Sequence, residues 1–374
     1  MHRWRHRAGI QAREKRLRTS EFEYDLPPEL IAQTPIEPRD ASRLLVLHRT
    51  GGRIEHRHFR DIPTYLRSGD LLVANESRVL PARLFGHKLP TGGKVEMLLL
   101  KQRDDQTWEV LLKPGRRVKP GTRIGIHAAG SSTEGRTGIS NDTCRVVADV
   151  VGTTEAGGRV IAFSVPIGPL LEDMGILPLP PYIHTPLQDA ERYQTVYARV
   201  NGSVAAPTAG LHFTPELMQH LKEVGVEFAF VTLHISMDTF RPVQEENIQD
   251  HRMYTEYCEL PPETSDAINQ ARVEGRRVIA VGTTSVRVLE TAALRSPAGA
   301  AALKPLAGPT NLFISPGFQF RVVDAMLTNF HLPRSTLLML VAAFAGKDLI
   351  DQAYQQAIHH RYRFYSFGDA MLIL

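Results

Sequence analysis

The amino-acid sequence predicts an α/β fold in which a discontinuous α/β domain carries an inserted small β-barrel domain. Between Asp70 and Val165, short β-rich runs alternate with turn residues at the spacing of a small barrel or sandwich. After Pro166 strands and helices alternate, which is typical of an α/β layer. We therefore predict an insertion, with the cleft between the two domains as the binding site. The expected bounds are a basic, disordered extension over 1–19, an α/β domain over 20–69 and 155–374, and a barrel over 70–154.

The composition is that of an ordinary folded protein. Of the 374 residues, 43% are apolar and 22% are charged, which excludes disorder and fibrous structure. The only cysteines, Cys144 and Cys258, lie far apart, which excludes a disulfide framework and favours a reducing cytoplasm. The longest apolar run, Leu337 to Ala345, is less than half of the roughly 20 residues that a bilayer span requires. We expect it to form a buried helix, and we expect no membrane contact.

The net charge of +4 comes from the N-terminal end of the chain. Residues 1–19 carry a charge of +6, which leaves −2 for all other residues. Such a tail could contact phosphates, but a disordered leader, an organelle transit peptide and an upstream start codon are also compatible with it. A nucleic-acid surface elsewhere would need locally clustered basic residues.

The barrel strands are predicted where β-branched, leucine-rich and aromatic runs are bounded by glycine, proline and aspartate turns. These runs are 70–74, 78–86, 94–100, 107–112, 122–126, 144–151 and 159–165.

The second half of the chain is predicted as alternating helices and strands. Thr214 caps a helix that begins at Pro215 and ends before Gly225. The elements that follow are a strand over 226–235, a helix over 265–275, a strand over 278–281, a helix over 285–294, a surface loop over 296–309, the apolar helix, and an amphipathic helix over 349–358.

Several common chemistries lack the residues that they need. The sequence has no GxxxxGK[ST], no GxGxxG ahead of a helix, no HExxH and no GxSxG. Hydrolysis of nucleoside triphosphates, dinucleotide redox chemistry and serine hydrolysis are therefore disfavoured. His56 and His58 lie in a basic run, so we expect a solvated strand there and no metal site.

Four polar segments in apolar surroundings are the candidate site. The first, 202–214, carries Thr208 and His212 in a loop of small residues ahead of a helix, where backbone N–H groups can approach a ligand. In the second, 281–290, an apolar strand ends at Gly282 and three hydroxyl residues follow, at a position where α/β sheets bind ligands. Ordinary helix capping is the alternative interpretation of both.

The other two segments carry the remaining titratable candidates. The third, 327–336, places Asn329 and His331 ahead of the apolar helix, where buried polar groups need partners or a function. The fourth, 250–257, contains Glu256 among other charged residues. A solvated charge cluster is the alternative interpretation of this fourth segment.

Long motifs extend over almost the whole chain. They are FEYDLPPELIAQTP (22–35), SRLL (42–45), GDLLVANESRVLPARLFG (69–86), PLPPYI (178–183), YQTVYA (193–198), SVAAPTAGLHF (203–213), VGTTSVR (281–287), LTNFHLP (327–333), STLLMLVAAFAG (335–346) and RYRFYSFGDAM (361–371). In these motifs the chain closely resembles the S-adenosylmethionine:tRNA ribosyltransferase-isomerase family of queuosine biosynthesis. Residues 1–19 lie outside the resemblance.

The resemblance implies an α/β domain with a β-barrel domain, in agreement with the predicted insertion. It also implies an enzyme that transfers the ribosyl part of S-adenosylmethionine to 7-aminomethyl-7-deazaguanine at the wobble position of tRNA. The ribosyl group is isomerised, and epoxyqueuosine tRNA, adenine and methionine are released. Because S-adenosylmethionine is consumed as a co-substrate, no cofactor, metal or nucleoside triphosphate is expected.

In this reaction the sulfonium acidifies the adjacent ribose carbon, and a base must remove its proton while another group helps adenine to leave. From residue type we predict His212 or Glu256 as the base and His331 as the acid toward adenine. The predicted substrate-binding residues are Thr208, Gly210, Thr283, Thr284, Arg287 and Asn329, with Arg287 pairing with the methionine carboxylate.

Contacts with the anticodon loop are predicted for Asn75, Arg78 and Arg83, near the start of the barrel. Solvation of a strand edge is the alternative for the two arginines. We take a monomer as the default state.

The chain departs from the family pattern at a few positions. Ile176 and Leu177 stand where the family usually has His-Met, so no catalytic role can rest on that histidine. Ser236 and Asp238 stand where glycines are usual, and their side chains could narrow a ligand pocket. The segment 75–77 reads Asn-Glu-Ser in place of Asn-Asp-Thr.

Two other functions compete with this one. A tRNA-binding module without activity would use the same surface but would release no adenine. A methyltransferase would produce S-adenosylhomocysteine, but the sequence lacks the glycine-rich first loop that supports that function.

Overall fold

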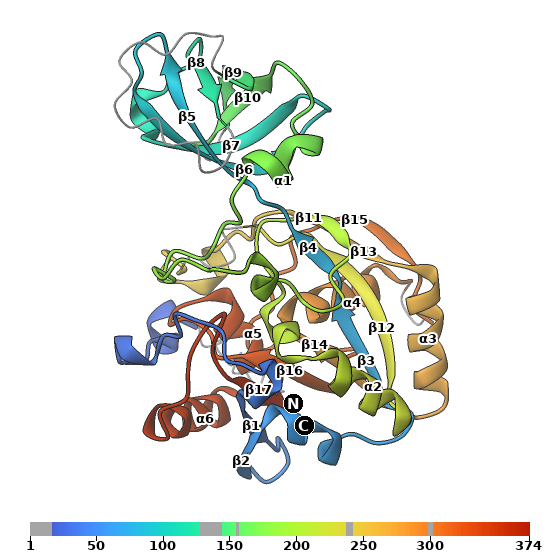
Figure 1. Ribbon diagram of the computed structural model, residues 1–374. Coiled ribbons are helices and arrows are strands. Elements are labelled where there is room, and N and C mark those ends of the chain that lie inside the picture. Colours follow the sequence, from blue (N-terminus) through green and yellow to red (C-terminus); the bar gives the residue numbers. More distant parts are fainter. Residues whose placement is uncertain (1–16, 128–143, 155–156, 237–241, 298–301) are drawn as a thin grey trace, which may run out of the picture.

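The computed structural model shows two lobes of unequal size, with the barrel lobe joined to the large lobe through the segments next to β4 and α1 (Figure 1). The structure describes residues 17–127, 144–154, 157–236, 242–297 and 302–374.

The large lobe is built on a nine-stranded sheet of order β15-β13-β12-β3-β14-β16-β17-β1-β2. In that order the strands are Leu306–Thr310, Glu256–Leu260, Glu227–Leu233, Leu71–Asn75, Val278–Val281, Ala325–Asn329, Ala370–Ile373, Arg43–Leu47 and Ile54–His58. The central strands β12, β3, β14 and β16 are parallel, so their carboxyl ends lie at one edge.

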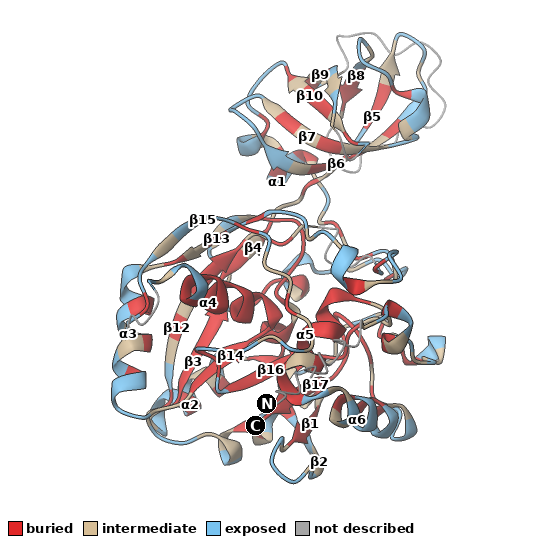
Figure 2. Cartoon of the chain, turned by 180° about the vertical axis from the view of Figure 1, so that it is seen from behind, coloured by how far each residue is buried: buried red, intermediate tan, exposed pale blue. Residues whose placement is uncertain are grey.

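The sheet is covered on both faces, and its strands are therefore continuously apolar. In β1, Leu45 and Leu47 pack into one core while Leu44 and Val46 pack into the other. The first core includes side chains of α3 (Pro262–Val273), α4 (Thr283–Arg295), α5 (Thr336–Ala345) and α6 (Lys347–His359), and the second includes α2 (Pro215–Glu223). Burial on both faces is the usual arrangement of parallel sheets. Figure 2 shows α4 and α5 as buried elements, whereas α3 and α6 present exposed faces.

The small lobe is a closed antiparallel barrel of order β10-β7-β6-β5-β8-β9. In chain order, β5 to β10 are Arg83–Leu89, Lys94–Gln102, Thr107–Lys113, Arg123–Ile126, Val146–Thr153 and Arg159–Phe163. The barrel has its own apolar core, which also takes in α1 (Leu171–Met174). Two short strands, β4 (Ser77–Val79) and β11 (Val200–Ser203), form a parallel pair. In sequence, β4 comes just before the barrel strands, and β11 comes after them and before β12.

The structure confirms the predicted fold class and corrects the predicted bounds. Strand β3 belongs to the central sheet because it pairs with β12 and β14, and β10 closes the barrel, so the barrel strands extend from Arg83 to Phe163 and not over 70–154. The predicted loop 296–309 contains the start of β15, which forms the sheet edge.

The N-terminal bound also shifts. Thr19 is buried, and its backbone N–H donates to the Glu246 carbonyl at 2.8 Å, so this last residue of the predicted extension belongs to the fold. Residues 1–16 of that extension lie outside the described part of the chain. Among the described residues, no helix combines the length and apolar character needed to cross a membrane.

Two separate cores predict two separable unfolding transitions. Replacing the buried barrel residue with alanine, Ile161→Ala, should destabilise the barrel by about 2–5 kcal/mol through loss of packing. Trp108 lies in the barrel core and Trp4 is the other tryptophan of the chain, so in a Trp4→Phe background the fluorescence reports on the barrel alone. In the variant, the fluorescence transition should move to a lower urea concentration. The transition followed by helical circular dichroism, which reports on the large lobe, should keep its urea midpoint. Movement of both transitions together would contradict independent cores.

Candidate active site

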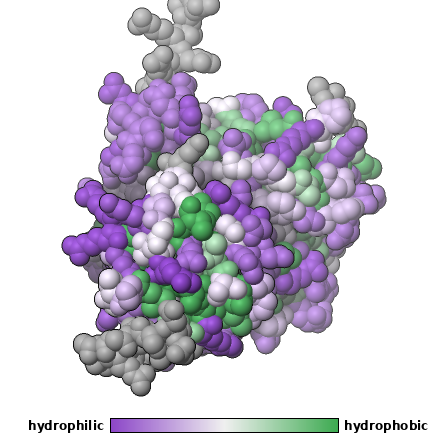
Figure 3. Space-filling model, turned by 90° about the horizontal axis from the view of Figure 1, so that it is seen from above, coloured by the Kyte–Doolittle hydropathy of each residue, from purple (hydrophilic) through white to green (hydrophobic). Residues whose placement is uncertain are grey.

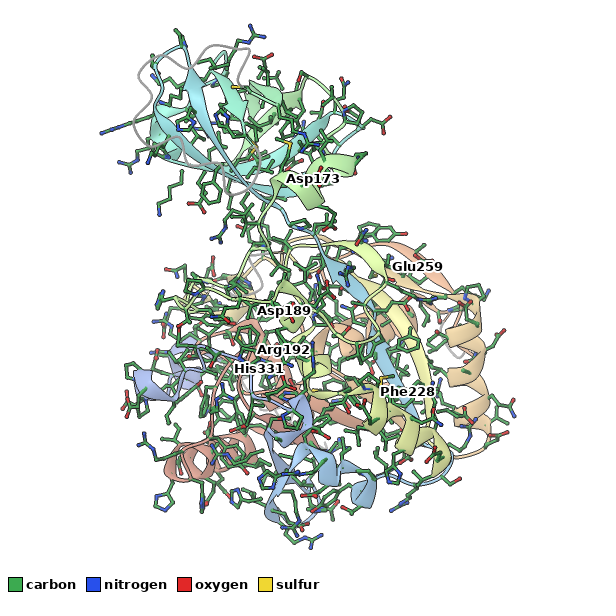
Figure 4. All side chains as sticks on the ribbon, viewed as in Figure 1. Asp173, Asp189, Arg192, Phe228, Glu259 and His331 are labelled. Carbon is green, nitrogen blue, oxygen red and sulfur yellow. The ribbon has the colours of Figure 1, made fainter. Side chains whose placement is uncertain are left out.

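Three of the four predicted polar segments meet at the carboxyl edge of the parallel strands. They surround a cavity of about 540 Å³, including space open to solvent. Its walls are Tyr182, 206–209, Ile235, 282–284, 328–332, Leu337, Tyr365 and Ser366. All of these residues belong to the large lobe, so the cavity lies within that lobe and not in the predicted cleft between the domains. Figure 4 shows His331 inside the large lobe and Asp173 on the barrel lobe.

The first wall is the start of α4. Strand β14 ends at Val281, and Gly282 turns the chain with a φ of 89°, a conformation that favours glycine. Thr283 and Thr284 then open the helix and line the cavity, so the positive end of the helix dipole faces it. The buried Thr284 Oγ1 has no hydrogen-bond partner within the described chain. This wall therefore offers a free hydroxyl beside helix N–H groups.

The second wall is organised by Asn329 at the end of β16. Its Nδ2 donates to His212 Nε2 and to the Tyr365 carbonyl, both at 3.2 Å, and its Oδ1 accepts from Thr208 Oγ1 at 3.1 Å. Since His212 Nε2 accepts, its Nδ1 carries the proton and donates to Ser42 Oγ at 2.7 Å. The amide thus joins three segments that lie far apart in the sequence.

His212 lies behind the cavity wall. It is buried, it stacks on Phe59 with ring centroids 5.0 Å apart, and it is absent from the cavity lining. Burial, together with the nearby charges of Arg363 and Arg39, lowers its pKa to about 3. Because both ring nitrogens are already bonded, the geometry fits a positioning role toward Asn329 better than the predicted role as base.

His331 does line the cavity. Its Nε2 is 2.8 Å from Thr328 Oγ1, and its backbone N–H donates to the Tyr354 hydroxyl at 2.9 Å. Burial lowers its pKa to about 3, so the ring is neutral at pH 7. A neutral imidazole accepts a proton more readily than it gives one, which disfavours the predicted acid role.

Glu256 and Arg287 form a buried ion pair away from this cavity. Glu256 also accepts a hydrogen bond from the Ser236 backbone N–H at 2.8 Å, and Arg287 Nε donates to the Leu312 carbonyl at 3.2 Å. Glu256 instead lines a second cavity, together with Ser236. The pair joins β13 to α4, so the predicted base and the predicted carboxylate partner are bound to each other.

Gly210 lies behind the wall as well. A Cβ atom there would be 2.0 Å from the Tyr197 hydroxyl and 2.8 Å from Thr195 Cγ2, so glycine is needed for packing. It is absent from the cavity lining, and its predicted contact with substrate is not supported by its position.

The three residues predicted to contact tRNA differ in exposure. Asn75 is fully buried: its Nδ2 donates to the Leu233 carbonyl, and its Oδ1 accepts from the N–H groups of Leu233 and Ser77. Its role is to join β3 to β12, and it cannot contact RNA. Arg78 and Arg83 are partly exposed, and they pair with Glu191 and with Glu96 respectively.

The structure places the departures at Ile176 and Ser236 outside the main cavity. Ile176 is exposed, and its backbone pairs with Arg83 at the base of the barrel. Ser236 lines the second cavity and not the main one. Asp238 lies outside the described residues.

The sequence reasoning missed the aromatic wall of the cavity. Tyr182 and Tyr365 line it, with ring centroids 4.9 Å apart, and the Tyr182 hydroxyl is 2.7 Å from Ser366 Oγ. Both tyrosines occur in the motifs quoted above, but tyrosine among apolar residues is typical of a core. No pattern in the sequence distinguished these two from core residues.

A cavity lined by hydroxyls and aromatic rings at the carboxyl edge of a parallel sheet defines an enzyme-type site for a small ligand. A family model described as queuosine biosynthesis protein matches residues 19–373. The S-adenosylmethionine:tRNA ribosyltransferase-isomerases of Moorella thermoacetica and Symbiobacterium thermophilum are each 54% identical to the chain, covering 96% of it and all of each relative. The chain therefore belongs to the queuosine biosynthesis protein family.

A solved structure supports the same assignment. The crystal structure of an S-adenosylmethionine tRNA ribosyltransferase from Thermotoga maritima is 44% identical to the chain. The match covers 95% of this chain and all of the Thermotoga maritima chain, with a TM-score of 0.53.

The contacts of Asn75 predict a structural effect of its removal. Asn75→Ala leaves three buried backbone groups without partners, so the free energy of unfolding should fall by about 2–4 kcal/mol. The control Arg78→Ala removes only a partly exposed ion pair and should cost less than about 1 kcal/mol. Urea unfolding of both variants measures the difference, and equal losses would contradict this role of Asn75.

The buried histidines predict a loss of stability in acid. The folded pKa of His212 and of His331 is about 3, below the ordinary value of 6.5, so the unfolded chain binds more protons as the pH falls below 6.5. Each histidine should therefore lower the free energy of unfolding by about 2 kcal/mol between pH 7.5 and pH 5. Urea unfolding of wild type and His212→Gln at both pH values tests this. The variant should lose about 2 kcal/mol less than wild type, and equal losses would refute the contribution of His212.

Proposed function

We propose that this enzyme transfers and isomerises the ribosyl group of S-adenosylmethionine onto 7-aminomethyl-7-deazaguanine at the wobble position of tRNA. The products are epoxyqueuosine tRNA, adenine and methionine. One observation carries the proposal: two relatives, each 54% identical to the chain over their full length, are both named S-adenosylmethionine:tRNA ribosyltransferase-isomerase. The enzyme is thus a transferase and isomerase of tRNA modification.

The main cavity is the proposed site of S-adenosylmethionine. Its hydroxyls, from Thr208, Thr283 and Thr284, can bind the ribose or the methionine carboxylate. The start of α4 favours the carboxylate because helix N–H groups and the helix dipole attract negative charge. Arg287 is paired with Glu256, so in this proposal the helix start replaces it as the carboxylate site.

His331 is the proposed proton acceptor. The sulfonium acidifies the neighbouring ribose carbon, and removal of that proton begins the rearrangement that releases adenine. Among the described residues that line the cavity, His331 is the single imidazole. Asn329, held by His212, fixes the wall beside it.

The anticodon loop is proposed to reach the cavity along the surface that carries Arg78 and Arg83, which are partly exposed beside the barrel. Loop recognition uses phosphate contacts and stacked bases, and therefore needs both polar and apolar surface. The face seen from above in Figure 3 is mainly hydrophilic with separate apolar patches. We further propose that the protein is a cytoplasmic monomer. It requires no bound cofactor in this proposal, because S-adenosylmethionine is consumed as a co-substrate.

Product analysis tests the reaction. With S-adenosylmethionine and tRNA that carries the deazaguanine, the protein should release adenine and methionine, and with guanine at the same position it should release neither. Binding without adenine would indicate a tRNA-binding module, and S-adenosylhomocysteine would indicate a methyltransferase. Either result would reject the proposal.

The variant His331→Gln tests the proton acceptor. It should lower kcat for adenine release by about 100-fold or more while S-adenosylmethionine still binds. The exposed substitution Val273→Ala on α3 is the control and should leave kcat unchanged. A kcat within threefold of wild type for His331→Gln would exclude this role.

A further inference from the structure

The aromatic wall of the cavity is held in place from several sides. The rings of Tyr182 and Tyr365 are tilted by 55° to each other, and Phe330 lines the same cavity. The Tyr182 hydroxyl, which lies in the plane of the ring, forms a hydrogen bond of 2.7 Å with Ser366 Oγ. The Tyr182 ring is thus fixed by its hydroxyl and by its contact with the Tyr365 ring.

The backbone of Tyr365 adopts an unusual conformation that helps to set this wall. Its φ is 69°, in the left-handed region that a non-glycine residue seldom adopts. The conformation is maintained by three hydrogen bonds: its N–H donates to the Phe330 carbonyl, and its carbonyl accepts from Asn329 Nδ2 and from the Gly368 N–H. Strained backbone that the surrounding structure holds in this way is characteristic of binding sites.

The charge of the cavity lining is the second observation. Among the described lining residues there is no aspartate, glutamate, lysine or arginine, and the one histidine is neutral at pH 7. A cation bound here would therefore meet no carboxylate from these residues. The sources of negative potential among these residues include the faces of the aromatic rings and the oxygens of the hydroxyl and amide groups.

We propose that the ring faces of Tyr182 and Tyr365 hold the sulfonium cation of S-adenosylmethionine and make the site selective for the charged sulfur. This inference rests on the proposed function, since it names the part of the donor that this wall contacts. Selectivity for charge also accounts for product release. When the bond between sulfur and the ribosyl carbon breaks, its electron pair passes to sulfur and leaves a neutral thioether in methionine. The rings then lose the charge that they attract, and the product is held less tightly.

Binding measurements with a charged and a neutral ligand test this inference. S-adenosylhomocysteine keeps the adenine, ribose, ammonium and carboxylate of S-adenosylmethionine but has an uncharged sulfur. Titration calorimetry with the wild-type protein should show tighter binding of S-adenosylmethionine by tenfold or more. Equal affinities for the two ligands, with adenine release intact, would overturn the inference and leave the proposed function standing. No binding of S-adenosylmethionine together with no adenine release would overturn both.

Substitutions of Tyr365 test whether its ring binds the sulfonium. Tyr365→Leu should weaken binding of S-adenosylmethionine by about 30-fold, the effect of a desolvated cation–π contact, and binding of S-adenosylhomocysteine by less than threefold. Tyr365→Phe keeps the ring and should keep the selectivity. Equal weakening of both ligands in Tyr365→Leu would mean that the ring supplies only packing, which contradicts the inference.

A second position keeps the test decisive if Tyr365→Leu does not fold. Tyr182→Phe retains the ring, and a trifluorinated phenylalanine at the same position retains its shape while removing the negative potential of its face. Selectivity for S-adenosylmethionine should fall by about tenfold from the first variant to the second, and adenine release should fall with it. Equal selectivity in the two variants would overturn the role of Tyr182.

Discussion

The hydrogen bonds of Asn329 are the constraint on which the candidate site depends. A buried primary amide must satisfy its donors and its acceptor, because an unpaired buried polar group costs about 1–3 kcal/mol. Asn329 does so by bonding to Thr208 and His212, which belong to one segment, and to the Tyr365 backbone, which belongs to another. These residues of the cavity wall and the histidine behind it are therefore joined in a single hydrogen-bond network.

The parallel sheet determines where that network can form. Strands β14 and β16 are buried on both faces, so polar side chains are accommodated only where the strands end, and the two strands end at the same edge. None of the barrel residues that the structure describes lines the cavity, and the barrel has a separate core. The candidate cavity thus belongs to the large lobe.

The electrostatics of the cavity fit a donor that already carries its own charge. The described lining offers hydroxyls, an amide, a neutral imidazole and aromatic rings, while the buried pair of Glu256 and Arg287 lies elsewhere. A carboxylate beside a sulfonium would stabilise the substrate strongly and hold it in place. Weaker partners, distributed around the donor, can bind the cation without preventing its loss of charge during the reaction.

The sequence by itself determined the fold class, the insertion, the cap at Thr214 and the strand Val278–Val281, because hydrophobic periodicity and turn chemistry are local. Its motifs also identified the family and placed Thr208, Thr283, Asn329 and His331 in the candidate site. Only the tertiary structure decided that Asn75 joins two strands, that Glu256 binds Arg287, that His212 lies behind the wall and that Tyr365 lies in it. These outcomes depend on which distant residues become neighbours and on how deeply each is buried, and neither quantity is encoded in the spacing of residues along the chain.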